Sequence, residues 1–276
     1  MKKVAVPTDF SECSKNALVY AACLLKEMGG GVLELIHVYM PNIDAEYPAF
    51  VPPVNDFIKE KEETLSLFVE GIQHQNLVDE SLIKIKQIFV VGFPAEEIYH
   101  LSSDYDLIVM GKTGSSNLLD KFLGSVSTTV AQKSKCPVLL IPEDTAFTPI
   151  RNIMFGSNYE SVKHTTLEKL FVFNNPFNAK LHFVYISDSS SESFQDNVKV
   201  IFDEMMNNQW SSTSFEISEL KADSVIEGFN QYVDSNSIDL LTLVNIKKSM
   251  LEYIFEKSTT KAMAFQIKIP LMIYHL

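Results

Sequence analysis

The chain has 276 residues, of which 46% are hydrophobic and 21% are charged. At roughly 150 residues per domain, this length fits two domains or one large α/β domain, and the composition excludes a collagen-like or intrinsically disordered chain. The 23 Lys and Arg residues face 35 Asp and Glu residues, which gives a formal net charge of −12 and no run of basic residues. A surface this acidic repels a phosphate backbone, so we expect no nucleic-acid partner.

The longest apolar runs, such as 107–110 and 138–141, have the length of strands and fall far short of the roughly 20 residues of a membrane-spanning helix. Asp9 interrupts the N-terminal segment before the apolar region of a signal peptide could form. The three cysteines are an odd number without CxxC spacing and indicate reduced thiols. We therefore expect a cytoplasmic protein with no membrane partner.

Short apolar runs alternate with amphipathic segments along the first half of the chain. The pattern predicts strands at 3–8, 32–38, 83–91, 107–110 and 138–141. It predicts four helices. The first runs from about residue 11 and ends at Gly29–Gly31, the second follows the proline-rich loop 40–55, the third spans 94–101 and the fourth lies near 125–134. Strands that alternate with helices predict a parallel sheet that is covered on both faces.

The second half repeats this order. Residues 152–155 match 3–6 at an offset of 149, and residues 238–241 and 268–271 match 105–108 and 135–138 at an offset of 133. The offset falls by 16, which we assign to the loop 40–55, because it has no counterpart after Ile186. The sequence therefore predicts two copies of one α/β unit, a domain at 1–145 and a domain at 150–276.

A glycine-punctuated loop follows the predicted strand at 107–110. Gly111 and Gly114 are followed, after nine residues, by Gly124 and Ser125 at the start of a predicted helix. In a doubly wound sheet, ligands bind at the carboxyl ends of the strands, where glycines and a helix N-terminus can receive a phosphate. The alternative is that the glycines only shape a turn and Ser125 only caps a helix.

Asp9 ends the first strand and would face this loop, because the first and fourth strands of such a sheet are neighbours. A carboxylate at this position could accept hydrogen bonds from ribose or hold a Mg²⁺ ion that the phosphates carry. The alternative is that Asp9 or Ser11 caps the following helix.

These segments resemble the universal stress protein family over residues 2–142. The resemblance lies in Pro7–Ser11, Leu35–Val38, Asp106–Gly111, the G-x2-G-x9-G-S spacing and Cys136–Ile141. It implies two tandem doubly wound five-stranded parallel-sheet domains, which are Rossmann-like and of the adenine nucleotide alpha hydrolase-like type. It also implies ATP binding in stress response, with Asp9 at the ribose or at Mg²⁺ and phosphate. The other site residues that it implies are Pro7, Thr8, Val38, Met110, Gly111, Lys112, Gly114, Gly124, Ser125, Val126 and Ser127. Lys112 could add charge beside a phosphate, and the alternative is a solvated loop lysine.

The second half departs from this motif. Asn158 stands where Asp9 does, while Val244, Lys247 and Lys257 replace the three glycines and Ser258 remains in place of Ser125. We expect nucleotide only in the first domain, with the second domain either as a built-in dimer partner or as the holder of a different ligand. The resemblance implies dimers through the last strand, so Val138–Ile141 and Leu271–Tyr274 would pair within the chain as an intrachain pseudo-dimer.

The sequence offers no general base for turnover, so catalysis is at most weak ATP hydrolysis. A slow ATPase, or an interaction scaffold with no nucleotide function, is the alternative to ATP binding. An unidentified protein partner and a homodimer also stay open.

Overall fold

The structure is a computed structural model. It describes residues 3–40, 54–74, 78–79, 81–112, 125–157, 164–187, 198–199, 201–203, 212–221, 225–245 and 268–275.

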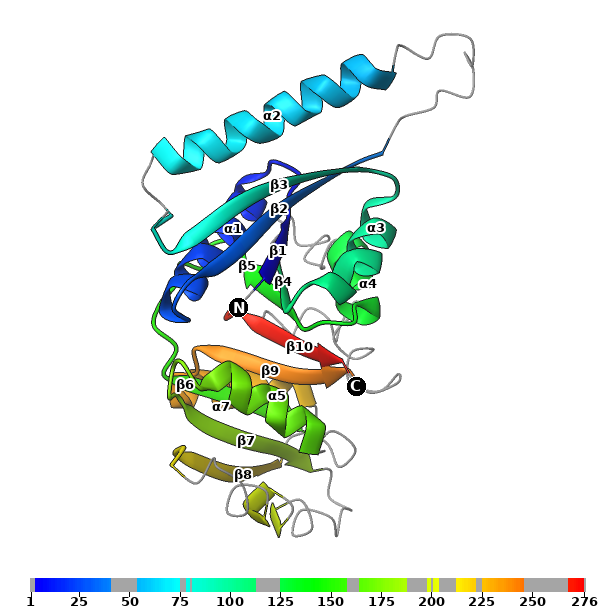
Figure 1. Ribbon diagram of the computed structural model, residues 1–276. Coiled ribbons are helices and arrows are strands. Elements are labelled where there is room, and N and C mark those ends of the chain that lie inside the picture. Colours follow the sequence, from blue (N-terminus) through cyan, green and yellow to red (C-terminus); the bar gives the residue numbers. More distant parts are fainter. Residues whose placement is uncertain are drawn as a thin grey trace.

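The described strands form one ten-stranded sheet in the order β3-β2-β1-β4-β5-β10-β9-β6-β7-β8 (Figure 1). The strands of the N-terminal half are β1 (Lys3–Pro7), β2 (Gly31–Tyr39), β3 (Ile83–Val91), β4 (Leu107–Lys112) and β5 (Val138–Pro142). Those of the C-terminal half are β6 (Asn152–Ser157), β7 (Lys180–Ser187), β8 (Phe215–Lys221), β9 (Leu240–Asn245) and β10 (Leu271–His275). Every pair within a half is parallel. The predicted α/β fold with parallel sheets is confirmed.

Helices cover both faces of this sheet (Figure 1). The cluster on one face includes side chains of α1 (Glu12–Glu27), α2 (Val54–His74) and α5 (His164–Asn174). The cluster on the other face includes side chains of α3 (Pro94–Leu101), α4 (Ser125–Lys133) and α7 (Val225–Asn236). A short 3-10 helix, η1 (Ser102–Asp104), follows α3. Both clusters contain residues from both halves, so each face of the sheet has one continuous apolar layer.

The two halves meet where β5 and β10 pair antiparallel, with Leu139 opposite Met272. This is the edge-to-edge pairing that the sequence predicted. Both strands are buried along most of their length. Because β5 and β10 would otherwise be sheet edges, the pairing satisfies backbone groups that an open sheet leaves unpaired.

The strand registers confirm the internal repeat. Lys3 and Asn152 begin equivalent strands, and Leu33 and Leu181 occupy the same position on the next strand. The equivalent of Ile85 on β3 is Phe215 on β8. The sequence offset between equivalent residues of the two halves therefore decreases between the second and third strands of each half. The predicted loop 40–55 lies in this interval. Most of that loop lies outside the described residues.

Local chemistry explains where α1 begins and ends. The Ser11 side chain accepts a hydrogen bond from the backbone N–H of Ser14, which is the N-cap arrangement. Gly29 and Gly30 have positive φ angles of 86° and 92°, which glycine adopts without steric cost. A Cβ at Gly30 would also lie 2.5 Å from the carbonyl oxygen of Leu82. The predicted glycine stop is confirmed.

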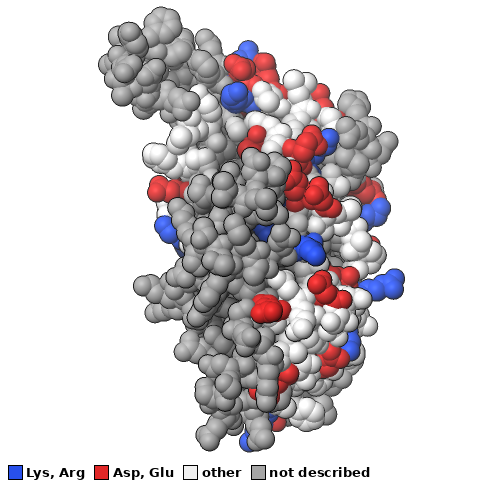
Figure 2. Space-filling view, turned by 180° about the vertical axis from the view of Figure 1, so that it is seen from behind, with Lys and Arg blue, Asp and Glu red and all other residues white. Residues whose placement is uncertain are grey.

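The described part of the chain contains no helix long and apolar enough to cross a membrane. Figure 2 shows acidic side chains gathered in the upper part of one face, with basic side chains scattered singly among them.

Candidate functional site

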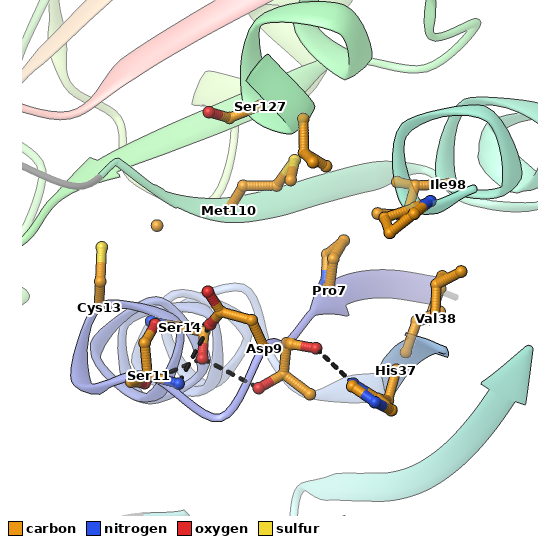
Figure 3. A pocket seen from close by; sticks show the side chains of 15 residues that line it. Pro7, Asp9, Ser11, Cys13, Ser14, His37, Val38, Ile98, Met110 and Ser127 are labelled. Atoms are coloured by element: carbon orange, nitrogen blue, oxygen red, sulfur yellow. Dashed lines mark hydrogen bonds between the residues drawn. The ribbon is translucent and has the colours of Figure 1, made fainter. Parts of the chain in front are cut away.

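A cavity of about 300 Å³ lies at the carboxyl ends of β1, β2 and β4. The strand order reverses here, because β1 pairs with β2 on one side and with β4 on the other. This is the topological switch point at which open parallel sheets bind ligands. Figure 3 shows Asp9, Ser11 and Ser14 on one side of the cavity and Met110 and Ser127 across from them.

Eight of the residues that the sequence predicted line this cavity. They are Pro7, Thr8, Asp9, Val38, Met110, Gly111, Val126 and Ser127. Lys112, the last residue of β4, is not among the lining residues, and burial lowers the pKa of its ammonium group to about 8. It is part of a strand and is not the solvated loop lysine that the sequence left as an alternative. Gly114 and Gly124 lie outside the described residues, as does the side chain of Ser125.

Seven further residues line the cavity and were not predicted as site residues: Ser11, Cys13, Ser14, Ile36, His37, Pro94 and Ile98. The alternation of β2 carried a signal for Ile36, because it faces the same side of the sheet as Val38. No local signal pointed to Pro94 and Ile98, which α3 brings to the cavity from a distant part of the sequence.

Asp9 is held in place by Ser11. Its Oδ1 accepts hydrogen bonds from the Ser11 hydroxyl at 2.5 Å and from the Ser11 backbone N–H at 3.1 Å. Burial alone would raise the pKa of the Asp9 carboxyl, but the hydrogen bonds, chiefly from Ser11, outweigh it and lower the pKa. Ser11 caps α1, so of the two capping candidates the structure selects Ser11. Asp9 is an ionised acceptor at neutral pH.

Two buried hydroxyls tie the end of β1 to α1. Ser14 donates to the carbonyl oxygen of Ser11, so its one proton is used, and Thr8 donates to Ser14 Oγ at 2.9 Å. Thr8 Oγ1 in turn accepts a hydrogen bond from the backbone N–H of Phe10. The loop that carries Asp9 is therefore fixed from both of its ends.

Phe10 adopts a left-handed backbone conformation, with a φ of 66°. This conformation is uncommon for a bulky residue and is sustained where the surroundings fix it. The Phe10 ring lies 4.4 Å from the His37 ring and 5.6 Å from the Phe68 ring, measured between centroids. His37 Nδ1 lies 2.9 Å from the carbonyl oxygen of Thr8 and, since a carbonyl can only accept, Nδ1 carries the proton. His37 therefore packs between aromatic rings near the end of β2, and it also lines the cavity.

Gly111 is required by the packing of α1. A Cβ at this position would lie 2.6 Å from both the carbonyl oxygen and the Sγ of Cys13. The sequence explained this glycine by the close approach of a phosphate. The structure adds a reason within the protein, because a larger residue would push α1 away from β4.

Three titratable side chains are found among the described lining residues, Asp9, Cys13 and His37, and no lysine or arginine is among them. Burial, followed by the nearby Glu143 and Asp9, raises the pKa of the Cys13 thiol to about 11, so it stays protonated and is a weak nucleophile at neutral pH. Nowhere in the described chain do three or more His, Cys, Asp or Glu side chains form a group that could hold a metal ion. The carboxylate of Asp9 fits a hard cation such as Mg²⁺ only if a ligand supplies most of the oxygens.

Comparison with known proteins places this geometry in a family. The family model described as "Universal stress protein family" matches residues 1–142. The chain belongs to the universal stress protein family.

The relatives agree with this assignment. A universal stress protein of Methanocaldococcus jannaschii is 33% identical over 153 residues, which cover 51% of this chain and 94% of the relative. One from Synechocystis is 22% identical over 295 residues and covers 99% of this chain and all of the relative. The crystal structure of a universal stress protein from Archaeoglobus fulgidus has a TM-score of 0.77 at 18% identity and covers 99% of this chain and 98% of its own, so it shows the fold. This universal stress protein is thus similar to relatives of one unit and of two units.

In the C-terminal half of this universal stress protein, buried side chains fill the space beside the counterpart of Pro7. Gly156 of β6 occupies that position, and a Cβ there would lie 2.5 Å from Cζ of Phe229 and 2.7 Å from Cδ2 of Leu243. The Phe229 ring, from α7, is fully buried. Val244 pairs with Tyr274 as Gly111 pairs with Ile141, which confirms Val244 as the counterpart of Gly111. The counterparts Asn158, Lys247, Lys257 and Ser258 lie outside the described residues.

Proposed function

We propose that this universal stress protein binds an adenine nucleotide, as Mg²⁺·ATP, in the cavity of its N-terminal half and acts in the response to stress. The observation that carries the proposal is the position of the cavity, at the strand-order reversal between β1 and β4, with Asp9 at the end of β1 and Gly111 at the end of β4. A volume of about 300 Å³ lies at the small end of the range for small-molecule sites.

The proposed roles follow the chain. The backbone at Val38 contacts adenine, with Pro7, Thr8 and Met110 as the apolar and polar wall of the base and ribose region. Asp9 contacts the ribose or the cation. The phosphates lie at Gly111, Gly114, Gly124 and Ser125–Ser127, with Lys112 near them. Bound Mg²⁺ would neutralise phosphate charge, which suits a lining whose described part contributes no lysine or arginine.

Only the N-terminal half binds nucleotide in this proposal. The buried Phe229 ring fills the space beside Gly156, and Val244 replaces Gly111 at the end of the equivalent strand. A buried aromatic ring cannot leave its place without exposing apolar surface and opening a cavity. The C-terminal half therefore has a packed core where the N-terminal half has a site.

The two halves are proposed to be two domains, residues 1–145 and 150–276, with the second domain as a permanent partner of the first in an intrachain pseudo-dimer. The antiparallel pairing of β5 with β10 supports this arrangement. A cytoplasmic location is part of the proposal and fits three cysteines that are all free thiols.

Isothermal titration calorimetry of the intact protein with Mg²⁺·ATP tests the proposal. We expect one site per chain, and weaker binding in Asp9→Asn, which keeps the shape of the side chain but removes its charge. The control is a titration with Mg²⁺ without nucleotide, for which we expect no saturable binding. Two sites per chain, or unchanged affinity in Asp9→Asn, would contradict the assignment.

A further inference from the structure

Ser11 joins the Asp9 carboxylate to the first helix through one hydroxyl group. The hydroxyl accepts a hydrogen bond from the Ser14 N–H at 3.2 Å, as a helix cap, and donates its proton to Asp9 Oδ1 at 2.5 Å. The backbone N–H of Ser11 donates to the same oxygen at 3.1 Å. Capping requires the acceptor function of the hydroxyl only. The contact with Asp9 requires its donor function.

The two hydrogen bonds fix the rotation of a side chain at the mouth of the cavity. Both end on Oδ1, and Asp9 and Ser11 both line the cavity (Figure 3). An exposed carboxylate on a loop would lose rotational freedom when it bound a ligand, and that loss weakens binding. Here the Asp9 side chain has already lost most of its rotational freedom in the folded protein, before any ligand binds.

We propose that Ser11 is a positioning residue for the ligand, holding Asp9 by Oδ1 so that Oδ2 is presented to a hydroxyl group or a cation of the bound nucleotide. This inference rests on the proposed function, since it assigns the ligand of Oδ2 to the nucleotide. The lowered pKa of the Asp9 carboxyl agrees with it, because hydrogen bonds to the ionised form favour that form. The other titratable side chains that line the described cavity are those of Cys13, from α1, and His37, from β2.

Two substitutions separate capping from positioning. Ser11→Thr keeps a hydroxyl that can both accept and donate. Ser11→Gly removes the hydroxyl, yet glycine at an N-cap position costs only a few tenths of a kcal/mol. Ser11→Gly should therefore keep α1 folded while it releases Asp9 Oδ1 from the side-chain hydrogen bond.

The chain offers a matched control far from the cavity. In the turn before β3, Asp79 Oδ1 accepts a hydrogen bond from the Ser81 hydroxyl at 2.6 Å and from the Ser81 N–H at 3.2 Å. This pair has the same geometry as Asp9 and Ser11, but neither residue lines the cavity. Ser81→Gly therefore removes an equivalent hydrogen bond without touching the site.

The test measures Mg²⁺·ATP affinity by calorimetry in Ser11→Gly, Ser11→Thr, Ser81→Gly and the unsubstituted chain, with circular dichroism to compare their helix content. If Asp9 has to be immobilised on binding instead of beforehand, affinity should fall by up to about tenfold, which we expect in Ser11→Gly alone. Affinity in Ser11→Gly equal to that of the unsubstituted chain, or an equal loss in Ser81→Gly, would overturn the proposal.

A second measurement needs no nucleotide. The Asp9 carboxyl is titrated by ¹³C NMR, its signal being assigned by its disappearance in Asp9→Asn. We expect the pKa of Asp9 to rise in Ser11→Gly and to stay low in Ser11→Thr, and an unchanged pKa in Ser11→Gly would overturn the positioning role. If the unsubstituted chain binds no nucleotide, the proposed function and the ligand of Oδ2 both fail, while this titration still decides whether Ser11 holds Asp9.

Discussion

Glu34 and His182 occupy the same position in the two halves of the sheet. Glu34 lies opposite Lys86 on the neighbouring strand, and His182 lies opposite Glu216. In the N-terminal half, the buried acid Glu34 contacts Lys3 at 3.1 Å and Lys86 at 3.5 Å.

The C-terminal half reverses this arrangement. His182 Nδ1 lies 2.9 Å from Glu216 Oε1, and Glu216 also forms an ion pair with Lys180. A tyrosine donates to the acid in each half, Tyr105 to Glu34 at 2.8 Å and Tyr232 to Glu216 at 2.5 Å. Both halves therefore have a polar cluster at the same position in the sheet. The acid of the cluster is on the second strand of the N-terminal half, as Glu34, and on the third strand of the C-terminal half, as Glu216.

This cluster makes stability depend on pH. Hydrogen bonds from Lys180 and then Tyr232 are the main reasons that the pKa of Glu216 falls from 4.5 to about 2. Because the folded pKa is depressed, the carboxylate stabilises the fold fully above pH 4.5, and this contribution is lost as the pH falls towards 2. In Glu216→Gln we expect lower stability at neutral pH and a shallower loss of stability across that acidic range.

Urea denaturation at a series of pH values measures this effect. Glu219→Gln is the control, because Glu219 is an exposed acid on the same strand. If Glu216→Gln lost stability with falling pH as steeply as the unsubstituted protein, the Glu216 carboxylate would not be the source of the pH dependence.

Gly111→Ala is expected to destabilise the N-terminal half. The new Cβ would lie 2.6 Å from the carbonyl oxygen of Cys13, which forces α1 or β4 to shift. Such overpacking typically costs about 1–3 kcal/mol. The measurement is the free energy of unfolding in denaturant, together with the affinity for Mg²⁺·ATP, which should fall as well because the cavity wall moves.

Gly71→Ala is the matched control for that experiment. Gly71 lies in α2, and a Cβ there would meet nothing within 4 Å. Alanine has the higher helix propensity, so this variant should be as stable as the unsubstituted protein or more stable by up to about 1 kcal/mol. Equal effects of the two substitutions would argue against the close contact of Gly111 with Cys13.

Phe229→Ala is expected to open a cavity beside Gly156 without creating a nucleotide site. Removing a fully buried phenylalanine side chain costs about 3–5 kcal/mol of stability, which denaturant unfolding measures. Phe202→Ala serves as the control, since its side chain is 50% exposed and its loss should change stability by less than about 0.5 kcal/mol. Calorimetry should still show one nucleotide per chain, because Asn158, Lys247 and Lys257 still stand where the N-terminal half has Asp9, Gly114 and Gly124. A second site in Phe229→Ala would mean that Phe229 alone closes the C-terminal half.

The fragment 1–145 is expected to form a dimer. In the whole chain, β5 pairs with β10 through Leu139 and its neighbours, and removing residues 150–276 leaves that edge of the sheet open. An open, apolar edge strand pairs readily with another chain. Sedimentation velocity should find two fragments per particle at micromolar concentration, and a stable monomer would show that β5 does not need a partner strand.

Much of the fold could be predicted from the sequence because the signals for it are local. The strand Ile83–Val91 and the helix Pro94–Leu101 have the predicted bounds, since apolar alternation, Gly92 and Pro94 mark them directly. The resemblance to the family predicted the pairing of β5 with β10, which the register confirms. The strand β2 runs one residue further at each end than predicted, from Gly31 to Tyr39, because its pairing with β3 extends it.

The site could be predicted only where a motif marks it. Local patterns were enough to predict the alternating elements and the short motif at Pro7–Asp9, because these depend on side-chain period and on neighbours in the chain. Three contacts emerge from the folded packing alone: Ile98 and Pro94 line the cavity, Gly111 makes room for Cys13, and Phe229 fills the space beside Gly156 in the C-terminal half. These contacts join residues far apart in the chain, and their fit depends on strand register and helix packing, which no local pattern records.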